Sequence, residues 1–116
     1  MIAPLRSEPT YVVTIAVGLL NCEKDELQLT SKAIEAIQLY VNSVGLCVTV
    51  TNTTFIYTGG REPGLLVGLI NYPRFPSTQE QINQHAINLA TRLREILHQK
   101  RISIIMPDRT VTIGDV

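Results

Sequence analysis

The chain has no tryptophan and few of the residues that usually carry chemistry. Its 116 residues include only two cysteines, two histidines and two phenylalanines. Cys22 and Cys47 lack the spacing of metal ligands, and a reduced intracellular thiol pair explains them as well as any other arrangement. No serine, histidine and aspartate form a recognisable nucleophile motif, which disfavours a nucleophilic hydrolase. With two histidines and no acidic residues at a metal-binding spacing, we expect no metal and no cofactor.

Net charge and long apolar runs are also missing. Ten basic residues balance ten acidic ones, and a neutral protein lacks the positive field that supplies most non-specific affinity for nucleic acid. No apolar run approaches the roughly 20 residues of a membrane span, and the amino terminus does not resemble a signal peptide. We therefore expect a cytoplasmic protein whose partners are neither nucleic acid nor membrane.

What the chain does have is apolar residues, which make up 45% of it. Their patterning alternates between β-branched runs and helical stripes. We expect strands at Tyr11–Leu20, Cys47–Thr58, Leu65–Tyr72, Ile102–Met106 and Thr110–Ile113. We expect one helix over Ser31–Val44 and a second helix beginning at the capping box Ser77-Thr78-Gln79-Glu80.

Local signals predict where these elements begin and end. Thr30 is a good N-cap for the first helix, and Gly45 lies where a left-handed residue ends a helix. Glu62-Pro63-Gly64-Leu65 has the residues of a type II turn, which predicts a hairpin there. The alternation of the second strand changes phase, which predicts a bulge near Asn52–Thr53.

The predicted order is β-α-β-β-α-β with a short terminal strand. This is the ferredoxin-like α+β plan, an antiparallel sheet ordered 4-1-3-2 with both helices on one face. Residues 1–116 then form a single domain, in which residues 1–10 are a flexible N-terminal segment. Strands one and three are central in this plan, and they are also the two most continuously apolar segments.

These central strands carry apolar residues on both faces, although the helices cover only one face. An uncovered apolar patch of several hundred Å² usually marks a contact surface, so we expect a homodimer or larger assembly. Packing by Phe55 or by the terminal strand is the alternative. The residues expected at the interface are Val12, Ala16, Leu66, Ile70 and Phe75.

Candidate ligand-binding residues lie at both ends of the third strand. The Gly59–Gly64 loop carries charges of both signs and two adjacent glycines, which suit a small anionic ligand, although turn formation alone also explains it. After the strand comes a stiff aromatic-proline segment. Glycines at 18 and 68 interrupt the central strands, as happens where a helix or a ligand approaches closely. The candidate ligand-binding residues are Tyr57, Arg61, Glu62, Tyr72, Arg74 and His85.

Two functional hypotheses follow, and no motif names a reaction. The first is a small homo-oligomeric binding or assembly module that self-associates through its sheet and carries a small-molecule pocket. The second is a cofactor-free small enzyme of the dimeric α+β barrel type. RNA binding, which the same strand order supports elsewhere, is rejected because the third strand offers Leu-Leu-Val-Gly-Leu-Ile in place of aromatic residues.

Overall fold

A computed structural model describes residues 3–20 and 24–115. Two helices and five strands make up the described chain. The helices are α1 (Glu26–Val44) and α2 (Gln79–Ile96). The strands are β1 (Val12–Gly18), β2 (Val48–Tyr57), β3 (Gly60–Ile70), β4 (Arg101–Ile105) and β5 (Thr110–Gly114).

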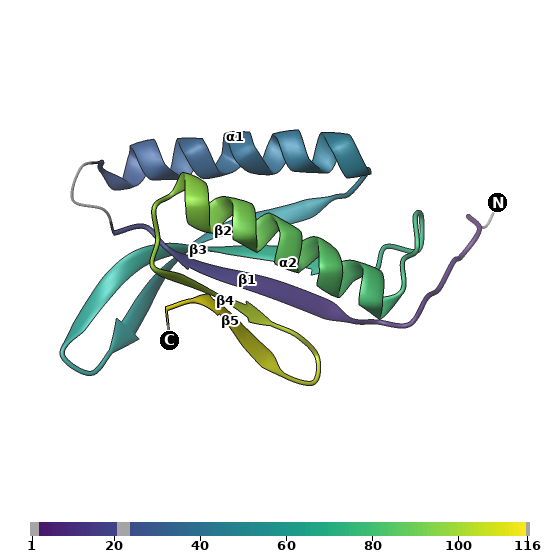
Figure 1. The fold of residues 1–116 in the computed structure, drawn as a ribbon. Coiled ribbons are helices and arrows are strands. Elements are labelled where there is room, and N and C mark those ends of the chain that lie inside the picture. The colour runs from purple at the N-terminus through teal and green to yellow at the C-terminus, as the bar shows by residue number, and fades with distance from the viewer. Residues whose placement is uncertain (1–2, 21–23, 116) are drawn as a thin grey trace.

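The five strands form one antiparallel sheet in the order β2-β3-β1-β4-β5. Both helices lie on the same side of this sheet, and its other side is uncovered (Figure 1). The predicted ferredoxin-like α+β fold and the predicted order of the first four strands are therefore confirmed, and β5 lies beyond β4 at the edge. We call the uncovered side the open face.

The core fills the space between the sheet and the helices. Val13, Ile15 and Val17 of β1 are fully buried on the helix side, and their partners across β3 are Leu69, Val67 and Leu65. Each helix contributes one apolar stripe to this layer, which is what the period of its sequence predicts. The buried helical residues are Leu29, Ala33, Ala36, Ile37, Tyr40, Ile82, Ala86, Leu89, Ala90 and Leu93.

The first helix begins earlier than predicted. Its N-cap is Asp25, whose side chain accepts a hydrogen bond from the Gln28 amide while Gln28 binds back to the Asp25 amide. This reciprocal capping box forms in place of the expected cap at Thr30. The helix that it starts includes Leu29, whose side chain is buried in the core. Gly45 has the predicted left-handed conformation, with a φ of 74°. Within the described chain, neither helix is long and apolar enough to cross a bilayer.

The hairpin between β2 and β3 turns at Thr58-Gly59, so the predicted turn over Glu62–Leu65 is wrong. Gly59 has a φ of 89°, a conformation that glycine adopts without strain. Pro63 instead lies inside β3, where its carbonyl accepts a hydrogen bond from the Leu19 amide at 2.9 Å. The nitrogen of Pro63 therefore faces β1 as well, just beyond the end of that strand. Because it does not face β2, the lack of an N–H costs no hydrogen bond to β2.

The predicted bulge in β2 is also wrong. The pairing runs without a break from Val48↔Leu69 to Tyr57↔Gly60. The apolar residues change sides because the hairpin extends past the helices (Figure 1). Val48 packs against the core on the helix side, whereas Phe55, farther along, lies on the open face opposite Glu62.

Candidate functional site

The predicted site residues do not form one cluster. Tyr57, Arg61 and Glu62 belong to the β2–β3 hairpin, whereas Tyr72 and Arg74 follow the other end of β3. These ends are separated by about ten residues of extended chain, or roughly 30 Å. His85 lies on α2 and therefore on the helix side of the sheet (Figure 1). Each group has to be considered separately.

His85 has a partner inside the fold. Its Nδ1 lies 2.9 Å from the hydroxyl of Tyr40 on α1, and the two rings meet edge to face with centroids 6.0 Å apart. Arg92 lies over the face of the same tyrosine, with Cζ 5.9 Å from the ring centroid. This arrangement joins the two helices and leaves His85 remote from the open face.

The aromatic-proline segment is held by buried and partly buried polar contacts. The Asn71 side chain is buried; its Nδ2 donates to the carbonyl of Pro9 at 2.9 Å, and its Oδ1 accepts from the Ser77 amide at 2.8 Å. The Tyr11 hydroxyl donates to the carbonyl of Ser77. These bonds tie both ends of the segment to the chain that precedes β1, so they explain its position without a ligand.

Within this segment Tyr72 contacts Phe75 and Cys47. The ring centroids of Tyr72 and Phe75 are 5.3 Å apart, and a hydrogen bond of 3.6 Å joins the exposed Cys47 sulfur to the Tyr72 hydroxyl. The hydrogen bond with Cys47, followed by burial and by the charge of an ionised Cys47, raises the pKa of Tyr72 above its ordinary value. Arg74 is exposed. Cys22 lies outside the described residues.

At the other end of β3, Glu62 lies on the open face above Gly18. Gly18 pairs with Gly64, and Glu62 is two residues along the same strand, so its side chain shares that face. A Cβ on Gly18 would lie only 3.1 Å from Glu62 Oε2. Glu62 is partly buried, and nothing in the described chain forms a hydrogen bond or ion pair with it. An unpaired, partly buried carboxylate is available to a ligand.

Gln99 reaches the same point from the turn between α2 and β4. Its Nε2 donates to the carbonyl oxygens of Leu20, at 3.1 Å, and Leu97, at 3.0 Å. Its Oε1 lies 3.5 Å from the Cβ position on Gly18. Sequence analysis missed this residue, because a single glutamine in a turn carries no pattern that connects it to a backbone carbonyl 79 positions away.

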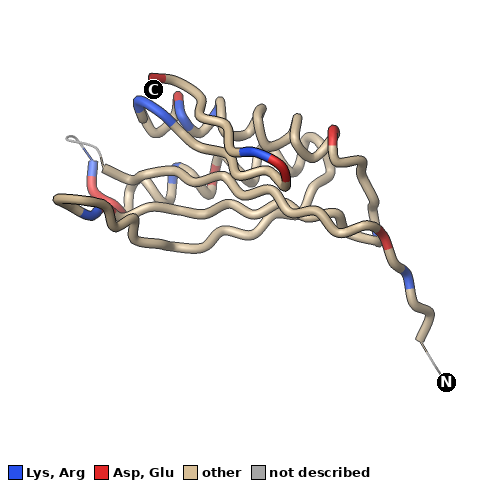
Figure 2. Tube along the Cα trace, turned by 90° about the horizontal axis from the view of Figure 1, so that it is seen from below, with Lys and Arg blue, Asp and Glu red and all other residues tan. Residues whose placement is uncertain are grey.

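The aromatic ring of Phe55 lies beside Glu62. A side chain on Gly64 would overlap the ring of Phe55, which therefore lies flat against the backbone beside Glu62. Charged residues occur only near the ends of the strands, and the middle of the sheet has none (Figure 2). Glu62 is the one acidic residue in the five strands. The site therefore combines the Glu62 carboxylate with the aromatic ring of Phe55 and the backbone of Gly18.

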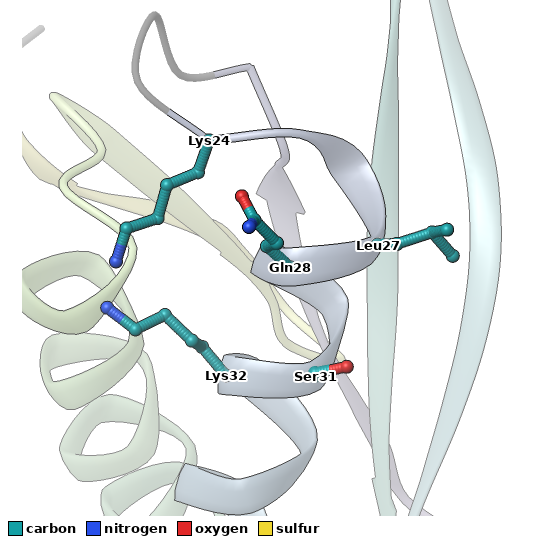
Figure 3. A pocket seen from close by; sticks show the side chains of 5 residues that line it. All are labelled: Lys24, Leu27, Gln28, Ser31 and Lys32. Carbon is teal, nitrogen blue, oxygen red and sulfur yellow. The ribbon is translucent and has the colours of Figure 1, made fainter.

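A separate open hollow of about 440 Å³ lies at the start of α1. In Figure 3 the amino groups of Lys24 and Lys32 point into the same space, and Leu27 points the opposite way, toward the neighbouring strands. The lining residues are Lys24, Leu27, Gln28, Ser31 and Lys32. None of the site residues predicted from the sequence lines this hollow.

No family model and no curated protein matches the chain. Solved structures do. A phage SAM lyase in complex with S-methyl-5'-thioadenosine matches with a TM-score of 0.69 and 14% identity, over 99% of this chain and 97% of that one. A phage SAM lyase in the apo state matches with a TM-score of 0.68 and 18% identity, over 90% and 89%. At these identities the likeness establishes the fold.

Proposed function

We propose that the chain is a small cofactor-free enzyme that cleaves a sulfonium nucleoside of the S-adenosylmethionine type. The observation that carries this proposal is the likeness in fold, over almost the full length of both chains, to a phage SAM lyase bound to S-methyl-5'-thioadenosine. The unpaired carboxylate of Glu62 supports it, because a cationic substrate needs a negative group at its site. The proposal agrees with the second hypothesis drawn from the sequence.

The chemistry suits a site without a cofactor. When the carbon–sulfur bond of a sulfonium ion breaks, the electron pair stays on sulfur, which becomes a neutral thioether. The released four-carbon fragment is completed either by its own carboxylate, which closes a ring, or by loss of a proton. Positive charge disperses on the way to the transition state, so an apolar, poorly hydrated surface favours cleavage over the charged ground state. The ring of Phe55, which lies against Gly64 beside Glu62, provides such a surface.

Glu62 then has a role in binding. The positive charge on the sulfonium is larger in the bound substrate than in the transition state. A carboxylate beside it therefore stabilises the bound substrate more than the transition state, so it lowers KM without raising kcat. A carboxylate that instead removed a proton would contribute mainly to kcat. The two roles are separated by the kinetic parameters of a Glu62→Gln variant.

The test is direct. Purified protein is incubated with S-adenosylmethionine, and S-methyl-5'-thioadenosine is measured by chromatography. We expect product formation, and we expect Glu62→Gln to raise KM about tenfold or more with a smaller change in kcat. Glu35→Gln, which changes an exposed acid on α1, is the matched control and leaves both parameters within about twofold. Absence of product would overturn the proposal.

We also propose that the chain self-associates through the open face. Val12, Ile70 and Ile105 are 47%, 40% and 46% exposed there, and Ala16 and Leu66 lie between them in the central strands. Apolar residues gathered on one uncovered face favour a contact with another subunit. Phe75, the remaining interface candidate, lies in the loop after β3 beside Tyr72 and is 41% exposed. Self-association is compatible with the enzymatic proposal, since each concerns a different part of the same face.

A further inference from the structure

Two acceptor oxygens converge above Gly18 without a donor between them. Glu62 Oε2 and Gln99 Oε1 lie 3.1 and 3.5 Å from one point, the position that a Cβ on Gly18 would occupy. The orientation of the amide is fixed by chemistry, because only an NH2 group can donate to both the Leu20 and Leu97 carbonyls. Within residues 3–20 and 24–115, neither of the two oxygens has a hydrogen-bond partner.

Two acceptor oxygens directed at one point are best satisfied by a hydrogen-bond donor or a positive group placed there. The neighbouring basic side chains Arg61 and Arg101 are exposed, and neither forms an ion pair with Glu62 in the described part of the chain. The Phe55 ring beside Glu62 adds a π-face, which also attracts cations. All three groups therefore favour a ligand that carries positive charge.

The backbone keeps these groups in place. The Leu19 amide donates to the Pro63 carbonyl at 2.9 Å, so β1 and β3 remain joined just beyond Gly18. The Gln99 amide donates to the Arg94 carbonyl at 3.0 Å and closes the turn after α2. A methyl group on Gly18 would occupy the point on which both oxygens converge, 3.1 Å from Glu62 Oε2 and 3.5 Å from Gln99 Oε1.

We infer that Glu62, Gln99 and Gly18 form a binding subsite for a positively charged group of the ligand, with Gln99 as a specificity-determining acceptor. The inference rests on the proposed function for the identity of the ligand, and it assigns part of that ligand to this subsite. In a sulfonium nucleoside the positive group is either the sulfonium centre or the amino group. Both are recognised by the same pair of oxygens.

The experiment measures dissociation constants for three probes with the wild type and with Gln99→Met. S-adenosylmethionine carries a sulfonium and an amino group, S-adenosylhomocysteine carries the amino group alone, and S-methyl-5'-thioadenosine carries neither. Dissociation constants for S-adenosylmethionine are taken before turnover is significant. Loss of a charge-assisted contact is worth about tenfold in affinity, so we expect Gln99→Met to lower the preference for the charged probes over the neutral one about tenfold.

A purely structural role for Gln99 would weaken all three probes alike, because the variant loosens the turn and leaves the ratio unchanged. Gly18→Ala should lower the same ratio. Its control is Gly68→Ala, which adds a methyl group on the same face against the side chain of Thr49. If S-adenosylhomocysteine loses as much affinity as S-adenosylmethionine, the subsite holds the amino group; if only S-adenosylmethionine loses affinity, it holds the sulfonium centre.

Two outcomes separate this inference from the proposed function. If S-methyl-5'-thioadenosine is produced but the ratio is the same in wild type and Gln99→Met, the subsite is wrong and the enzymatic proposal stands. If no product forms but the charged probes bind preferentially and lose that preference in Gln99→Met, the subsite stands and the reaction is wrong. Failure of all three probes to bind overturns the subsite as well.

Discussion

The hydroxyl of Tyr40 on α1 lies 2.9 Å from Nδ1 of His85 on α2 and joins the two helices above the sheet. Tyr40 is only 6% exposed, so its hydroxyl has little access to water and depends on this partner. A neutral histidine with its proton on Nε2 accepts a hydrogen bond from the hydroxyl at Nδ1. The pair therefore belongs to the packing of the helix layer, while the charged group available to a ligand lies on the opposite side of the sheet.

Removing the Tyr40 hydroxyl should destabilise the fold. Tyr40→Phe is expected to lower the free energy of unfolding by about 1 kcal/mol, because it removes one hydrogen bond from a buried position. In a double-mutant cycle with His85→Ala, urea unfolding should give a coupling energy of about 0.5–1 kcal/mol. Tyr57→Phe, at a hydroxyl on a half-exposed residue, is the control and should change stability by less than about 0.5 kcal/mol. Additive effects of the two substitutions would contradict the contact.

The Tyr72–Cys47 contact predicts an alkaline titration. The pKa of Tyr72 is raised first by its hydrogen bond with Cys47, so the fold favours the protonated phenol. This stabilisation is fully present below the ordinary tyrosine value of about 10 and is lost as the pH rises through the raised value. Phenolate absorbance should show the Tyr72 transition moving to lower pH in Cys47→Ala. Tyr72→Phe identifies the component, and an unshifted curve in Cys47→Ala would refute the assigned cause.

The sequence predicted the architecture well because apolar pattern and strand position agree. β1 and the Leu65–Ile70 part of β3 are the most continuously apolar segments of the strands, and a central position is the one that buries them. Gly45 was also correctly predicted, since its effect depends only on its own backbone. The errors came from competition between equally plausible local signals. Asp25 and Thr30 are both good N-caps, and only the burial of Leu29 decides between them.

The candidate site was predictable only in part, because local signals in the sequence identify single residues but not their neighbours in the fold. Glu62 was a candidate as the acid of the Gly59–Gly64 loop, and Gly18 was noted as a glycine that interrupts a central strand. Their proximity depends on strand register, which places Gly18 opposite Gly64. Gln99 was not predictable, because it joins the site through bonds to the distant Leu20 carbonyl and to Leu97. Only the folded chain brings that turn to the end of β1.

The end of α1 offers a test of backbone conformation alone. Gly45 has a φ of 74°, and no neighbouring atom lies within 4 Å of the Cβ position, so a substitution there meets strain without a clash. Gly45→Ala should lower the free energy of unfolding by about 1 kcal/mol. Gly45→Asn should cost about half as much, because asparagine tolerates the left-handed region better. Denaturant midpoints for the two variants measure this order, and equal costs would indicate that the helix ends differently.

The proposed self-association through the open face can be tested at Ile70. Ile70 pairs with Val12 across β1 and β3, and both side chains are partly exposed on that face. A lysine at position 70 would place a charge in the proposed interface, where its desolvation opposes association. Light scattering on a sizing column should show the wild type above its monomer mass of 12.9 kDa and Ile70→Lys close to it. Leu39→Lys is the matched control, because Leu39 is 62% exposed on α1, on the helix side of the sheet, and this variant should keep the wild-type assembly. A monomeric wild type, or dissociation caused equally by Leu39→Lys, would show that the open face is not the contact surface.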